Sequence, residues 1–104
     1  MKKFNHVGIP SPVEHPDESF NPDISLYTTD FEKSENRIEW LRFLEDCPLP
    51  DVLKNTAHVA YEVDDLDKAI EGKEVLLEPF SPNESLRVAF IMEDEAPVEL
   101  MQYC

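Results

Sequence analysis

The strongest constraint on the fold of this chain is a weak internal repeat. The segments "NHVGIP" and "AHVAYE" each place a histidine, His6 or His58, before a valine and a small residue. Each half of the chain also ends with a glutamate among apolar residues, Glu39 in "RIEWLRF" and Glu99 in "PVELMQY". The order His, Glu, His, Glu, with a period of about 50 residues, predicts two similar modules.

Most of the remaining sequence consists of short apolar or alternating blocks, which are typical of β-strands. Pairs such as Ser-Pro and Asn-Pro, and the segments "SPNES" and "EDEAP", separate these blocks as turns. The predicted strands cover residues 4–10, 24–31, 37–44, 58–63, 74–80, 87–92 and 97–103.

Helical signals are few. The segment "DDLDKAIEG" (64–72) predicts one short helix, because an Asp can cap its first turn and Gly72 can adopt the left-handed conformation that ends it. Residues 49–55 predict a further helical turn. The proline-rich stretch 10–23 has no periodicity and predicts an irregular loop, in which we expect His15 to be a surface residue.

Length and charge limit the classes of function. A chain of 104 residues is expected to form one domain, and its net charge of −14 makes a nucleic-acid partner improbable and favours cations. No apolar segment is long enough to span a membrane, so we expect no membrane partner and a cytoplasmic protein. Cys47 and Cys104 form no recognisable framework and are interpreted as free thiols.

The two glutamates are unusual because they share a strand face with apolar residues. Alternation places Glu39 with Leu41 and Phe43, and it places Glu99 with Met101 and Tyr103. A buried carboxylate is costly unless it is paired or bound to a metal ion. Taken singly, such a histidine is usually a hydrogen-bonded core residue and such a glutamate is usually solvated. Their repetition favours a mixed nitrogen and oxygen site for Zn, Ni, Co, Mn or Fe(II).

At these residues the chain resembles the vicinal oxygen chelate superfamily, which includes glyoxalase I, methylmalonyl-CoA epimerase, extradiol dioxygenases and bleomycin-resistance proteins. The resemblance is strongest in "AHVAYEVDDLDKAIEGKEVLLEP", "RVAFIM" and "APVELMQY", and it extends to "FNHVGIP" and "RIEWLRF". It implies an α+β fold of two βαβββ modules, about 1–55 and 56–104, that form a curled mixed sheet around a cleft. The first module lacks its helix, so the proline-rich loop or a second chain is expected to cover one face of its sheet.

The resemblance also implies a function. In the family the first and last strands of each module carry the metal ligands, which here correspond to His6, Glu39, His58 and Glu99. The implied protein is a divalent-metal-dependent isomerase or lyase that acts on a small-molecule substrate, with Glu99 as the first candidate for the catalytic base and Glu39 as the second. We also expect a homodimer. The additional carboxylate argues against an extradiol dioxygenase, which uses two histidines and one carboxylate.

Two other functions remain open. The first is a metal-free protein that binds an antibiotic or another aromatic compound, as bleomycin-resistance proteins do. Five aromatic residues could line its groove: Trp40, Phe43, Tyr61, Phe90 and Tyr103. The second is an interaction module in which the four polar residues persist without catalysis.

Overall fold

The computed structural model describes residues 2–104, which divide into two compact units. The N-unit comprises His6–Ala57. The C-unit comprises His58–Cys104 together with the described residues up to Asn5. Strands predominate and helices are few and short, so the predicted α+β class is confirmed.

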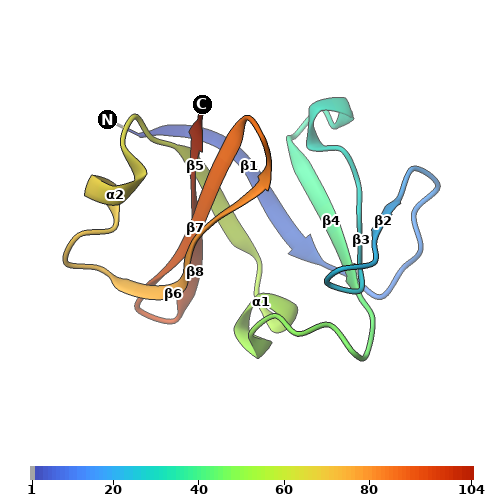
Figure 1. Ribbon diagram of the computed structural model, residues 1–104. Coiled ribbons are helices and arrows are strands. Elements are labelled where there is room, and N and C mark those ends of the chain that lie inside the picture. Colours follow the sequence, from blue (N-terminus) through green and yellow to red (C-terminus); the bar gives the residue numbers. More distant parts are fainter. Residues whose placement is uncertain (1) are drawn as a thin grey trace. The chain divides into compact units, whose positions relative to one another are not determined.

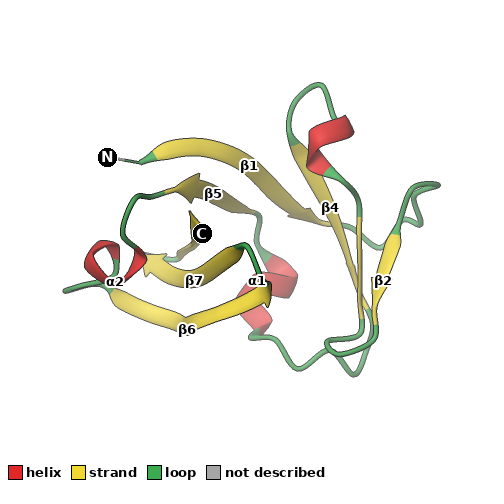
Figure 2. Cartoon of the chain, turned by 45° about the horizontal axis from the view of Figure 1, so that its top comes forward, coloured by secondary structure: helices red, strands yellow, loops and turns green. Residues whose placement is uncertain are grey.

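The C-unit is a four-stranded mixed sheet with one helix. Its elements in chain order are β5 (His58–Glu62), α2 (Leu66–Ala69), β6 (Glu74–Asn83), β7 (Leu86–Glu93) and β8 (Ala96–Tyr103). The strand order is β5-β8-β7-β6, in which β5 is parallel to β8 and the other neighbours are antiparallel. The sheet is strongly curved (Figure 2), and register shifts along β6 are consistent with this curvature.

The N-unit has the same strand order. Its elements are β1 (Lys3–Pro10, from His6 onward), β2 (Ser19–Asn21), β3 (Leu26–Thr28), the 3₁₀ helix η1 (Phe31–Lys33), β4 (Ile38–Phe43) and α1 (Asp51–Asn55). The order is β1-β4-β3-β2, with β1 parallel to β4 and antiparallel pairing elsewhere (Figure 1). The two units therefore share one strand order, but a helix follows the first strand only in the C-unit, and the predicted absence of a helix between β1 and β2 is confirmed.

All the predicted strands overlap observed ones, but the proline-rich stretch is partly ordered. Residues Ser19–Asn21 form β2, where an irregular loop was predicted. The strand forms because Phe20 packs on Tyr27 across the ladder, with ring centroids 4.7 Å apart. The Asn21 side chain accepts a hydrogen bond from the Asp23 amide and so stabilises the turn. The strand predicted at 24–31 is accordingly shortened to β3, and η1 follows it.

Helix α2 covers one face of the C-unit sheet. Asp65 caps it by accepting a hydrogen bond from the Lys68 amide, and Gly72 follows with a φ of 72°, as the sequence predicts. Leu66 is fully buried in a cluster with three apolar residues of β7 and β8: Ala89, Ile91 and Leu100. The helix is shorter than predicted, because only Leu66–Ala69 are α-helical.

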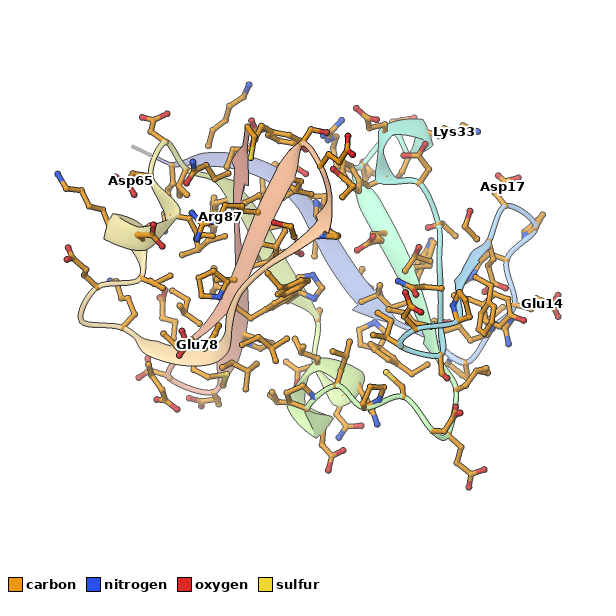
Figure 3. The ribbon with its side chains drawn as sticks, viewed as in Figure 1. Glu14, Asp17, Lys33, Asp65, Glu78 and Arg87 are labelled. Carbon is orange, nitrogen blue, oxygen red and sulfur yellow. The ribbon has the colours of Figure 1, made fainter. Side chains whose placement is uncertain are left out.

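The proline-rich loop covers the corresponding face of the N-unit sheet. The His15 ring stacks on the Trp40 indole with centroids 5.0 Å apart. Glu18 accepts two hydrogen bonds from the Arg42 guanidinium, the shorter 2.7 Å. His15 is therefore half-buried at 23 % side-chain exposure and not a fully exposed surface residue. The loop's outer residues, Glu14 and Asp17, project into solvent (Figure 3).

Two smaller predictions can also be compared with the structure. The helical turn predicted at 49–55 corresponds to α1. Both cysteines are free thiols, Cys47 buried and Cys104 exposed. Within residues 2–104, no helix combines the length and the apolar character that crossing a membrane requires.

Candidate functional site

The C-unit contains the more tightly packed of two histidine–glutamate pairs. His58 is the first residue of β5, and Glu99 lies in the neighbouring strand β8. Their side chains are 4 % and 12 % exposed, and His58 Nε2 lies 3.0 Å from Glu99 Oε1. The edge of the His58 ring packs against Phe90, with centroids 5.2 Å apart and an interplanar angle of 78°. Phe90 thereby holds the imidazole from the side.

The N-unit contains the second pair. His6 lies in β1 and Glu39 in β4, with His6 Nε2 3.5 Å from Glu39 Oε1. The His6 side chain is 2 % exposed, whereas that of Glu39 is 21 % exposed. The His6 ring stacks on Phe31 of η1, with centroids 4.2 Å apart and an interplanar angle of 10°. Both histidines are therefore oriented by an aromatic side chain.

Identical strand register produces the two pairs. In the parallel ladder of the N-unit, Gly8 is opposite Glu39, and in that of the C-unit, Ala60 is opposite Glu99. Each histidine precedes that small residue by two positions, so it lies on the same face as the glutamate. The repeated "His-Val-small" pattern therefore places a small residue across the ladder from each carboxylate.

Each pair offers one imidazole nitrogen and one carboxylate oxygen on a largely buried face. These are ligands suited to borderline and hard divalent metal ions, and no thiolate is among them. His6, Glu39 and His58 each present a ligand atom of the kind that holds a metal ion. The donor types and their burial therefore fit a divalent ion. In the structure as it stands, the carboxylate Oε1 of each pair is directed at the imidazole Nε2.

The neighbouring residues on these faces behave mostly as predicted. Leu41 and Met101 are buried on the faces of Glu39 and Glu99, respectively. Tyr103, which shares the face of Glu99, is instead 51 % exposed and is the last residue of β8. Arg42 alternates away from Glu39, as expected, and its guanidinium lies over the Tyr27 ring.

The five aromatic residues named for a metal-free binding groove do not all share one strand face. Tyr61 lies three positions after His58 in the sequence, so its side chain lies on the opposite face of β5 and packs against the α2 cluster. Phe90, in contrast, contacts His58. In the N-unit, Trp40 is occupied by its stack with His15. Tyr61 and Phe90 therefore lie on opposite faces of the C-unit sheet, and the metal-free binding function stays a prediction.

Sequence reasoning missed three residues near the pairs. Phe31 was expected at the end of a strand, and its stacking on His6 depends on the turn at η1. Asn5, 3 % exposed, donates a hydrogen bond of 2.9 Å to Glu62 Oε2, which lies on the His58 face of β5. Two signals in the sequence could have indicated this contact. Asn5 is next to His6, and Glu62 is four residues after His58 and therefore on the same strand face.

Comparison with known proteins yields a fold and no function. No family model matches the chain, and no curated protein matches its sequence. A crystal structure of a hypothetical protein from Bacillus halodurans C-125 is similar, with a TM-score of 0.74 and 17 % sequence identity. The match covers 99 % of this chain and 95 % of that one. This likeness concerns the fold alone, and the fold is compatible with that of the vicinal oxygen chelate superfamily.

Proposed function

We propose that the protein is a metal-dependent isomerase or lyase of the vicinal oxygen chelate type. In this proposal the two histidine–glutamate pairs bind one divalent ion in common, through His6, Glu39, His58 and Glu99. The observation that carries it is the recurrence of the same buried pair in the same ladder register in each unit. In both units the same residue types occupy the same ladder positions, including the small residue opposite the carboxylate. Core packing alone does not require this repetition.

The ion would be Zn, Ni, Co, Mn or Fe(II), and when bound it supplies a Lewis acid that stabilises negative charge on two adjacent substrate oxygens. The protein's own contribution is orientation. Phe31 and Phe90 fix the planes of His6 and His58, which reduces the rotamer entropy that ligand binding would otherwise cost. Burial of both imidazoles also keeps water from competing at these nitrogens.

Glu99 is the first candidate for the base. A carboxylate oxygen of Glu99 would accept a proton from the substrate carbon next to a carbonyl, and in an isomerase it would return that proton to the adjacent carbon. Its support is its close packing, because Glu99 is held at 3.0 Å from His58 and is 12 % exposed. Glu39 is the second candidate, since its carboxylate is more exposed and lies farther from its histidine.

Metal content tests the first half of the proposal. The protein is purified without a histidine tag, and bound metal is measured by elemental analysis in the wild type and in His6→Ala and His58→Ala. Stoichiometric metal in the wild type and its loss in both variants is the expected result. His15→Ala is the matched control, because His15 stacks on Trp40 and belongs to neither pair.

Retention of metal in both histidine variants would contradict the proposal, and so would a metal-free wild type after incubation with each candidate ion. If the metal-free protein bound aromatic antibiotics instead, the bleomycin-resistance type of function would replace the enzyme.

A substrate screen tests the second half. Adducts of 2-oxoaldehydes with thiols, and epimers of acyl-CoA thioesters, are incubated with protein loaded with each metal, and proton exchange at the acidic carbon is followed by NMR in D2O. We expect exchange with at least one of these small-molecule substrates. Light scattering on the same preparation tests the proposed homodimer.

A further inference from the structure

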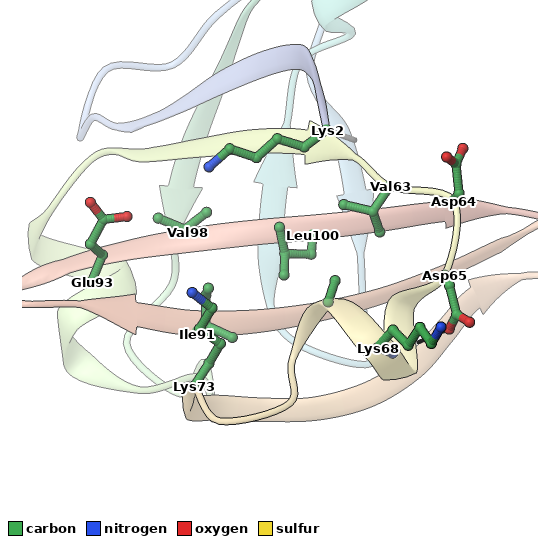
Figure 4. A pocket seen from close by; sticks show the side chains of 11 residues that line it. Lys2, Val63, Asp64, Asp65, Lys68, Lys73, Ile91, Glu93, Val98 and Leu100 are labelled. Carbon is green, nitrogen blue, oxygen red and sulfur yellow. Dashed lines mark hydrogen bonds between the residues drawn. The ribbon is translucent and has the colours of Figure 1, made fainter.

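The C-unit has a recess on the face of its sheet that carries α2, opposite the face of the histidine–glutamate pair. Helix α2 is four residues long and covers only part of the apolar sheet beneath it. Beside it lies a cavity of about 480 Å³, a volume within the range of small-molecule sites. Its floor is apolar and consists of Val63, Ala69, Ile91, Val98 and Leu100 (Figure 4).

Lysines of this strongly acidic chain gather around that floor. The chain has 9 Lys and Arg residues against 23 Asp and Glu, yet Lys2, Lys68 and Lys73 all line the recess. None of the three ammonium groups forms an ion pair within residues 2–104, although potential acidic partners are abundant. Their positive charge is therefore not neutralised by a carboxylate of the described chain.

The charges are arranged unevenly along the recess. Figure 4 shows Lys2 reaching over Val98 and the Lys73 ammonium beside Ile91, on the two sides of the floor. The Lys2 ammonium lies 4.4 Å from the centroid of the Tyr61 ring, on the α2 face of the sheet, although Lys2 as a whole is exposed. The acidic lining residues lie at the ends of the recess, Glu93 at one and Asp64 and Asp65 at the other.

We propose that this recess binds a small amphipathic carboxylate. Its apolar chain would lie on the floor along Val98 and Leu100, and its carboxylate would lie between Lys2 and Lys73. We choose this class of ligand because of charge complementarity. Lysines in solvent would need no ligand, and an apolar floor without lysines would accept a neutral molecule. Cations on both sides of an apolar floor select a ligand with an anionic group at one end.

The recess is separate from the proposed metal ligands. Strand alternation directs Val98 and Leu100 to the α2 face of β8, whereas Glu99 between them faces the other side. Binding in the recess therefore does not rest on the proposed enzymatic function, and its failure would leave that proposal untouched.

Calorimetric titration with octanoate tests the proposal, with octanol and octylammonium as probes that have the same chain and a different head group. We expect saturable binding of octanoate to the wild type, tighter than that of octanol, and no binding of octylammonium. The double variant Lys2→Gln/Lys73→Gln is expected to weaken octanoate binding about fivefold, since each exposed charge contributes modestly. The double variant Lys3→Gln/Lys33→Gln removes the same charge outside the recess and should bind as the wild type does.

A third variant tests the floor. Ala69→Leu adds side-chain volume to the recess at a half-buried position of its floor, and it is expected to reduce octanoate binding while circular dichroism confirms an unchanged fold. Three outcomes would overturn the proposal: no saturable binding of octanoate, equal binding of octanol, or equal affinity in the two lysine double variants. Unchanged affinity in a correctly folded Ala69→Leu protein would do the same.

Discussion

The two units have one strand order and one histidine–glutamate register, but they cover their sheets by different means. In the C-unit a helix inserts a fully buried leucine, Leu66, into an apolar cluster. In the N-unit a proline-rich loop lays His15 on Trp40 and pairs Glu18 with Arg42. In each unit the parallel ladder of the first and last strands positions the histidine–glutamate pair. The difference teaches that this ladder forms whether a helix or a loop covers the sheet.

The pairs themselves also differ, and this gives the prediction with the largest effect. At saturating metal, Glu99→Gln is expected to lower turnover by about 10²–10⁴-fold, the usual cost of losing a general base, and Glu39→Gln by much less. Both variants keep the shape of the side chain, so unfolding curves should match that of the wild type closely. Steady-state kinetics on the substrate found by the screen measures the contrast.

A larger loss in Glu39→Gln than in Glu99→Gln would move the base to the N-unit. Equal and small losses in both would remove the glutamates from the chemistry and leave them as metal ligands.

The coverings differ in how much they stabilise the fold. Leu66→Ala is expected to lower the free energy of unfolding by about 3 kcal/mol, because it removes a fully buried side chain and leaves a cavity. Val13→Ala, in the loop that covers the N-unit, should change it very little, since Val13 is 58 % exposed. Urea unfolding of both variants measures the difference. If both variants lost similar amounts of unfolding free energy, Val13 would have to be buried in solution, and the loop would cover its sheet with more apolar contact than the structure shows.

The polar covering of the N-unit should make its stability depend on pH. The pKa of Glu18 is lowered below its ordinary value of 4.5, mainly by the hydrogen bonds from Arg42. Electrostatic attraction to His15 lowers this pKa further. A lowered folded-state pKa means that the stabilisation is complete above the unfolded-state value and is lost as the pH falls through the folded-state value. The stability difference between wild type and Glu18→Gln should therefore shrink as the pH is lowered below about 4.5.

Urea unfolding at a series of pH values measures this dependence. The control is Asp67→Asn in the C-unit, where the pair of Asp67 with Arg87 is 72 % exposed at the carboxylate and should matter little. A constant difference for Glu18→Gln across the series would show that the ion pair does not hold the loop.

The sequence predicts the features that depend on local alternation. The strands of the C-unit and the shared faces of Glu39 with Leu41 and of Glu99 with Met101 follow from period-two patterning. The same rule places Tyr61 on the face of β5 opposite His58, where it packs against the α2 cluster. The left-handed Gly72 follows from the freedom of glycine to adopt a positive φ after a helix.

Features that depend on distant partners could not be predicted in this way. Strand β2 needs Phe20 to meet Tyr27, and the orientation of His6 needs Phe31 to turn back over it. In both cases a loop conformation decides the contact, and a single sequence without periodicity does not specify that conformation. The register of the ladders, likewise, becomes visible only when the strands are paired.

The smallest expected effect concerns the stack that holds the proline-rich loop. His15→Ala removes one ring from the stack on Trp40, the only tryptophan of the chain, and should cost no more than about 1 kcal/mol of stability. Loss of the covering ring exposes one face of the indole to water, so the fluorescence emission should shift to longer wavelength and acrylamide should quench it more strongly. His15→Phe is the matched control, because it restores an aromatic ring without a titratable group. An emission spectrum unaltered in His15→Ala would mean that the loop leaves Trp40 uncovered in solution, and the N-unit would then need another cover, of which a second copy of the chain is the simplest.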